Sequence, residues 1–249
     1  MSRDLNICYC CGIELDKTTK TREHIPPKCF FPKGYKDELI TVPSCKEHNN
    51  AKSEDDEYLW QMIAINILAN KHGQNLATEK VVKSILRNRR LTKNLAKNSH
   101  LLYIENSNGS LEPTFGFEPN EEMIKRSISM LAKGVYFHEY KKVFDGNMFV
   151  FDENTIYIKG NNFQAHNKYL EKLRNCSKHI FNDQRKIGEN QEIFYYQFIE
   201  LNKSEKYFEI LLRLCFYENV VFLVSLKSGS KPNMDCNILS NSLLNIIYK

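Results

Sequence analysis

Two short-gap pairs of metal-binding side chains near the N-terminus restrict what this chain can fold into more than any other feature. Cys8 and Cys11 are separated by two residues and followed by Gly12, and Cys45 and His48 repeat the same gap. Zinc prefers four nitrogen and sulfur ligands in a tetrahedron, and a two-residue gap lets both members of a pair reach one ion. The sequence therefore predicts a closed structural Zn²⁺ site of three cysteines and one histidine.

The other cysteines are interpreted differently. Cys10 leaves a second pairing open, Cys8 with Cys10, but the glycine after Cys11 favours Cys8 with Cys11 because glycine accommodates the tight turn of a zinc knuckle. Four further cysteines have no partner at ligand spacing, and we interpret them as ordinary small apolar residues. They are Cys29, Cys176, Cys215 and Cys236.

The length of 249 residues allows one sizeable domain, or a small metal-organised module followed by a larger domain. Cysteine and histidine are distributed unevenly, with five of the eight cysteines in the first 60 residues, which favours a module at 1–60 and a second domain at 61–249. The segment MSRDLNICYC has no apolar signal-peptide core, so we expect a cytoplasmic protein with reduced thiols. No apolar run reaches the roughly 18 residues that a membrane span requires, so no membrane partner is expected.

The net charge of +5 is compatible with binding a polyanion, but a surplus of this size does not decide the matter. A helix is predicted over 77–97, with apolar residues near one face and cations on another. An ordinary solvated face is the favoured interpretation of these cations, and phosphate binding is the reserve hypothesis. The cations are Lys80, Lys83, Arg87 and Arg90.

The pattern elsewhere predicts an α+β protein, with helices followed by antiparallel strands. A helix is expected to follow Pro43 and to reach Leu68, and another is expected from Glu121 to Lys133, where Gly134 is a natural stop. The predicted strands are 21–25 and 39–42 in the N-terminal module, then the hairpins 148–151 with 155–158 and 208–216 with 221–224. The second of these hairpins alternates strictly, which predicts one buried face.

Four segments of the first quarter of the chain carry a family resemblance. They are CYCCG at 8–12, REHIPPKCFFP at 22–32, LITVPSCKEHNN at 39–50 and KSEDDEY at 52–58. Together they resemble the HNH endonucleases of the His-Me finger, or ββα-metal, superfamily, and within it a bacterial stand-alone group. The resemblance implies a treble-clef-like module in which a β-hairpin carries the catalytic base and the following helix closes both the zinc site and the active site.

The resemblance also implies the roles of individual residues and the reaction. His24 is the general base that takes a proton from the attacking water, because a histidine can be neutral at working pH. Glu23 and Asn49 hold a hard divalent ion, Mg²⁺ or Mn²⁺, with Asn50 as the alternative ligand. The expected substrate is DNA, and RNA remains open because the backbone chemistry is the same.

Two departures from the family pattern keep a rival interpretation open. Glu38 occupies the position of the middle asparagine, which normally orients the hairpin. Glu23 and His24 are adjacent, so a regular strand would point them to opposite faces. If both act in one active site, the backbone between them must be distorted. The rival is a non-catalytic treble-clef zinc module that binds nucleic acid or protein. The sequence leaves the oligomeric state and any partner protein undetermined.

Overall fold

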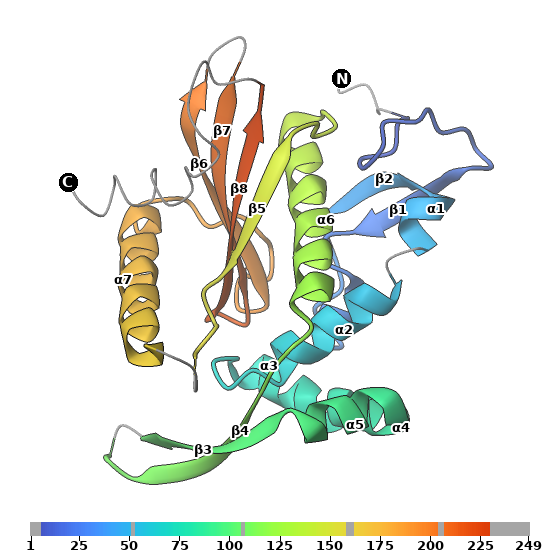
Figure 1. The fold of residues 1–249 in the computed structure, drawn as a ribbon. Coiled ribbons are helices and arrows are strands. Elements are labelled where there is room, and N and C mark those ends of the chain that lie inside the picture. Colours follow the sequence, from blue (N-terminus) through green and yellow to red (C-terminus); the bar gives the residue numbers. More distant parts are fainter. Residues whose placement is uncertain (1–5, 51–52, 106–107, 158–161, 204–206, 230–249) are drawn as a thin grey trace.

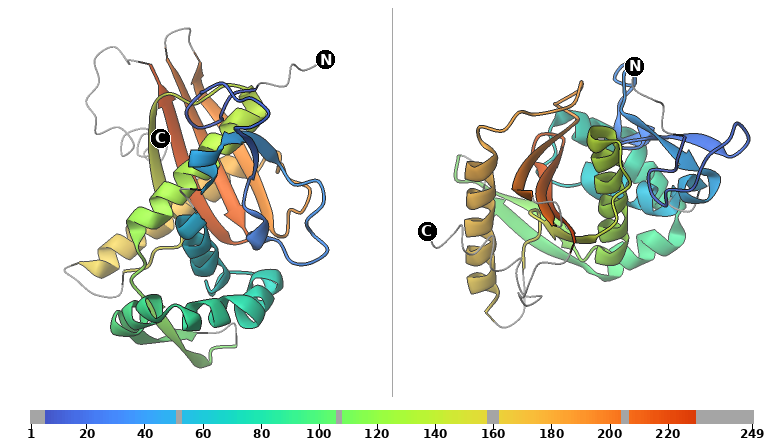
Figure 2. Two further views of the ribbon diagram at one scale, coloured as in Figure 1. Left: turned by 90° about the vertical axis from the view of Figure 1, so that its right-hand side faces the viewer. Right: turned by 90° about the horizontal axis from the view of Figure 1, so that it is seen from above.

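The computed structural model describes residues 6–50, 53–105, 108–157, 162–203 and 207–229, and it is an α+β structure. A four-stranded antiparallel sheet has the strand order β5-β8-β7-β6. Helix α7 covers one face of this sheet, helix α6 lies on the other, and the N-terminal hairpin lies beyond α6 (Figures 1 and 2). The bounds are β5 Asn147–Asp152, β6 Phe194–Lys203, β7 Phe208–Phe216, β8 Val220–Ser228, α6 Glu121–Tyr140 and α7 Phe163–Phe181.

The N-terminal hairpin is formed by β1 (Lys20–His24) and β2 (Thr41–Cys45), which pair antiparallel along their whole length. The predicted pair of strands is confirmed, although the returning strand begins two residues later than expected. Helix α1 (Lys46–Asn50) follows β2 directly and packs against both strands. The order strand, strand, helix expected of the module is therefore present.

Helix α6 continues through Gly134 to Tyr140, so the prediction that it stops at Gly134 is wrong. This glycine is buried against the N-terminal hairpin, and a Cβ atom there would clash with Cδ1 of Ile25. The absence of a side chain thus serves close packing between α6 and the residue that follows β1. After Gly134, Tyr136 and Phe137 are buried in the core, and Tyr140 is half-buried.

The predicted basic helix at 77–97 is divided into several segments. It begins as α3 (Lys71–Leu76), passes through the π-helical turn η2 (Ala77–Val81) into α4 (Val82–Arg87), and restarts as α5 (Arg89–Lys97). Asn88 interrupts it, because its side chain accepts a hydrogen bond from Leu91 N and caps α5. All four cations of this region are exposed, with Arg90 on a different segment from the others.

The preceding helix is also shorter than predicted. Helix α2 (Ser53–Ala64) ends before Leu68, which is exposed. Asn66 accepts a hydrogen bond from Leu68 N and so forms a local turn that competes with the helix. Residue 60 lies inside α2, and one core cluster contains side chains from Tyr9 to Leu226. The division at residue 60 therefore stays a prediction.

The sheet confirms one predicted hairpin and corrects the other. Strands β7 and β8 form a hairpin, but both of its faces are buried because α6 and α7 cover opposite sides. Strand β5 pairs with β8 and not with the following segment, which forms no strand at 155–157. Ile158 lies outside the described residues. The sequence interpretation also missed β6 and α7.

A second isolated hairpin joins β3 (Ser99–Glu105) to β4 (Leu111–Phe117), and the sequence did not predict it. None of its residues is buried, and Phe117 at its base packs against the main core. Leu101 and Phe115 are paired across the strands and both are more than half exposed. No helix among the described residues is long and apolar enough to cross a membrane.

Candidate metal centre and active-site face

The first half of the predicted zinc site is a tight turn closed by backbone hydrogen bonds. Gly12 N donates to Cys8 O, and Cys8 N donates to Ile13 O, both at 2.9 Å. Gly12 has a φ of +74°, a conformation that favours glycine over other residues. The turn brings the thiols of Cys8 and Cys11 to the same side, as expected for a zinc knuckle.

The second half of the site lies where β2 passes into α1. Cys45 ends the strand and His48 belongs to the helix. Sγ of Cys45 lies 3.0 Å from Nδ1 of His48. His48 Nδ1 is 4.0 Å from Cys8 Sγ, and the four ligand atoms all lie within 4.8 Å of one another. This Cys3His group has the donor set and compactness that tetrahedral zinc requires.

The open alternative for the first pair is also decided by the geometry. The thiol of Cys10 is directed at α6, where it lies 3.7 Å from Sδ of Met130, and it does not belong to the cluster. Burial would raise the pKa of the Cys8 thiol, but hydrogen bonds from the backbone amides of Cys11 and Cys45 lower it below its ordinary value. A lowered thiol pKa favours the thiolate, which is the form that binds zinc.

The remaining cysteines do not join the metal group. Cys29 and Cys176 are half-buried, and Cys29 packs against the main core. Cys215 is buried, and its thiol donates a hydrogen bond to Glu218 O. Cys236 lies outside the described residues. Among the described residues, the Cys3His group is the one set of three or more Cys, His, Asp or Glu side chains whose ligand atoms converge.

The register of the N-terminal hairpin separates its side chains into two faces. Successive strand residues point to opposite sides. The core-facing side carries Glu23 with Val42 and Ser44, all buried. His24 belongs to the other side, as does Cys45, which stands opposite Lys20. The zinc group and the predicted base thus share the face of the hairpin that is not buried in the core.

His24 has the environment of a neutral histidine close to cations. Its side chain is half-buried, and burial lowers the pKa of the imidazole below its ordinary value. The positive charges of Lys28 and Arg22 lower this pKa further. Both cations are exposed, so the surface around His24 combines a proton acceptor with groups that attract phosphate.

Glu23 does not share this surface. Its side chain is 5% exposed. Burial is the largest cause that raises the pKa of the Tyr9 phenol, and the negative charge of Glu23 is the second largest. The expected distortion of the backbone between Glu23 and His24 is not found, because β1 pairs regularly with β2 through His24. The carboxylate therefore points into the interior of the module, on the side opposite to the imidazole.

The predicted asparagine ligands and Glu38 lie near the hairpin in different settings. Asn49 is half-buried on α1 beside His48, and Asn50 is exposed at the end of that helix. Glu38 is exposed and has a φ of +54°, a left-handed conformation that asparagine adopts more readily than glutamate.

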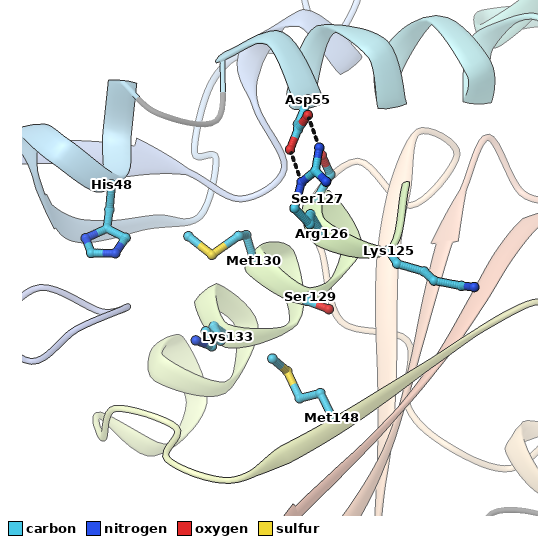
Figure 3. A pocket seen from close by; sticks show the side chains of 9 residues that line it. All are labelled: His48, Asp55, Lys125, Arg126, Ser127, Ser129, Met130, Lys133 and Met148. Carbon is cyan, nitrogen blue, oxygen red and sulfur yellow. Dashed lines mark hydrogen bonds and ion pairs between the residues drawn. The ribbon is translucent and has the colours of Figure 1, made fainter. Parts of the chain in front are cut away.

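A cleft beside the metal centre was not predicted from the sequence. Its volume is about 490 Å³, and it lies along α6 between His48 of the Cys3His group and strand β5 (Figure 3). Side chains from four elements line it, including His48, Asp55, Arg126, Met130, Lys133 and Met148. The cations of α6 recur at helical spacing in the sequence, but only the tertiary fold brings α6 against the metal module.

The chain was compared with models of protein families, with curated proteins and with solved structures, and none of the three comparisons finds a match.

Proposed function

We propose that this protein is a metal-dependent endonuclease of the HNH type that hydrolyses phosphodiester bonds in DNA. The observation that carries the proposal is the position of His24 on the same hairpin face as Cys45, within a strand–strand–helix unit joined by the Cys3His group. In this arrangement zinc has a structural role, because the four protein ligands complete its coordination.

His24 acts as the general base in this proposal. A base must be neutral to accept a proton, and the lowered pKa of the imidazole favours its neutral form. Water gives its proton to His24 and attacks the phosphorus, and the bond to the leaving 3′ oxygen breaks. Arg22 and Lys28 are placed to attract the phosphate before the reaction and to offset its charge.

A hard divalent ion, Mg²⁺ or Mn²⁺, would when bound supply charge stabilisation for the phosphate and the leaving oxygen. Asn49 is the proposed protein ligand because it follows a zinc ligand on α1 and offers an amide oxygen. Asn50 is the alternative. Mg²⁺ commonly keeps several waters and is held by one or two carboxylates together with substrate phosphates, so Asn49 alone lacks the usual carboxylate. Glu23 would have to leave the buried face of the hairpin to join Asn49.

The rival function is a zinc module that binds nucleic acid or protein without cutting. Two observations favour it: the burial of Glu23 on the face opposite to His24, and the glutamate at position 38 in place of an amide. Both interpretations share the zinc site, so only a reaction separates them.

Cleavage by the zinc-loaded protein decides between these two functions. We expect it to nick plasmid DNA when Mg²⁺ or Mn²⁺ is added and to be inactive without them. Asn49→Ala should raise the metal concentration for half-maximal activity, whereas the control Asn94→Ala, an exposed asparagine on α5, should leave it unchanged. A protein that cuts neither DNA nor single-stranded RNA with either ion contradicts the proposal and supports the binding module.

A further inference from the structure

The cleft along α6 combines concavity with a surplus of positive charge. Lys125, Ser129 and Lys133 are four residues apart and form one row on the helix. Arg126 lies in the adjacent row, and all four residues line the cleft (Figure 3). The only carboxylate among the lining residues is that of Asp55. Three cations and one anion thus line the cleft, although Lys125 extends away from Lys133 and His48 (Figure 3).

The cations differ in their availability. Arg126 forms a bidentate ion pair with Asp55, from Nε to Oδ2 at 2.8 Å and from Nη2 to Oδ1 at 3.0 Å. This pair orients the guanidinium, which is 57% exposed and retains further N–H donors. Lys125 is paired with Glu121 at 2.8 Å. Lys133 forms no ion pair with any residue that the structure describes, so its charge is available to a ligand.

A buried hydroxyl gives a second, independent indication of a ligand. Ser127 also lines the cleft and is 1% exposed, yet its Oγ has no hydrogen-bond partner among the described residues. Buried polar groups are normally satisfied, so an unused donor in a cleft wall is expected where a ligand or water completes it. Ser129 adds another hydroxyl to the same wall.

We propose that this cleft binds a backbone phosphate of the nucleic acid. The inference rests on the proposed function for the identity of the ligand. His48 belongs both to the zinc group and to the cleft wall, so the cleft adjoins the metal centre.

The role of the phosphate bound in the cleft is to hold the strand in register for cleavage. A competing basic surface exists on α4, where Lys80, Lys83 and Arg87 are exposed at or beside the helix. That surface is not part of the cleft and carries no unused buried donor. The two surfaces can be distinguished by the salt dependence of binding.

The test measures binding of a short DNA duplex over a range of salt concentrations, with all variants made in the His24→Ala background so that no DNA is cut. Each lost phosphate contact reduces the slope of log affinity against log salt by about 0.9 for duplex DNA. Lys133→Met keeps the aliphatic stem and should reduce the slope by about that amount. Lys172→Met, an exposed lysine on α7, removes the same charge and should leave the slope unchanged.

A second variant addresses Arg126 without changing the net charge. Arg126→Met with Asp55→Asn removes both members of the ion pair and should also weaken binding, because a positioned guanidinium is lost. Zinc content and melting temperature are measured for every variant, so that loss of the fold is recognised.

A Lys133→Met slope equal to that of Lys172→Met overturns the inference, as does a reduced slope for Lys83→Met alone. The proposed function and this inference fail separately. If the parent protein cuts DNA but Lys133→Met leaves the slope unchanged, only the cleft is wrong. If the parent is inert on DNA and RNA and Lys133→Met still reduces the slope, the cleft stands and the nuclease proposal fails.

Discussion

The two isolated hairpins of this protein differ in what holds them. In β1–β2 one face is buried, with Val42 and Ser44 beside Glu23, and Ile25 at its end packs into α6. In β3–β4 no residue is buried, although its strands are longer. The shorter hairpin therefore has the better-fixed backbone, because a lone two-stranded hairpin is marginally stable in water unless it packs on other elements.

This difference shows where precise chemistry can be placed. The face of β1–β2 turned away from the core carries His24, Arg22 and a zinc ligand, and the buried face fixes their positions. The faces of β3–β4 carry apolar side chains such as Tyr103 and Phe115 without any such anchor. A catalytic group on β3–β4 would lack the support from packed neighbours that a reactive side chain needs.

The largest effect is expected from breaking the metal group that joins β2 to α1. Cys45→Ser should lose zinc and unfold the N-terminal module, because structural zinc contributes on the order of 10 kcal/mol to a small domain. Elemental analysis should find one zinc per chain in the parent and none in this variant. Cys176→Ser, a half-buried cysteine on α7, is the matched control. Stoichiometric zinc in Cys45→Ser would exclude the assigned ligand set.

The convergence of the Cys3His group could be predicted because its information is local in the sequence. Two ligand pairs and Gly12 define the turn without knowledge of the rest of the chain. The strands around His24 were also predicted, since Pro26 and Pro27 mark the end of one of them. The paired segments 208–216 and 221–224 were found by their alternation and turn.

Other features depend on tertiary contacts that a single sequence does not reveal. Glycine commonly ends a helix, but at position 134 the contact with Ile25 makes it a packing residue within α6. The burial of Glu23 depends on which side of the hairpin faces the core. The cleft at Lys133 requires α6 to lie beside α1. Asn88 is an exception, because a capping asparagine is a local signal that could have divided the basic helix.

A smaller effect is expected when one apolar side chain is removed at each of the two hairpins. Ile25→Ala should destabilise the protein by about 3 kcal/mol, because it removes a fully buried side chain and leaves a cavity against α6. Phe115→Ala removes a larger side chain that is 68% exposed, and it should cost about 0.5 kcal/mol. Denaturant unfolding of both variants measures the difference. Equal costs would mean that the β3–β4 face is covered in solution.

The smallest effect concerns the loop between the strands of the first hairpin. Glu38→Asn should stabilise the protein by about 0.5–1 kcal/mol, because asparagine tolerates the left-handed conformation found there. Asp37→Asn removes the same charge from a neighbouring residue with a φ outside that region and separates backbone strain from electrostatics. The two melting temperatures decide the point. An equal gain in both variants would assign the effect to charge and leave the backbone explanation without support.

The most direct test of the central claim compares one histidine from each hairpin. His24 on β1 and His100 on β3 are both half-exposed strand residues, but only His24 lies on the face that also carries a zinc ligand. We measure single-turnover cleavage of plasmid DNA with Mg²⁺ for His24→Ala and His100→Ala, after confirming equal zinc content and equal melting temperatures. The account predicts a loss of roughly 10²-fold or more in rate for His24→Ala and none for His100→Ala. Cleavage by His24→Ala at the parent rate would contradict it.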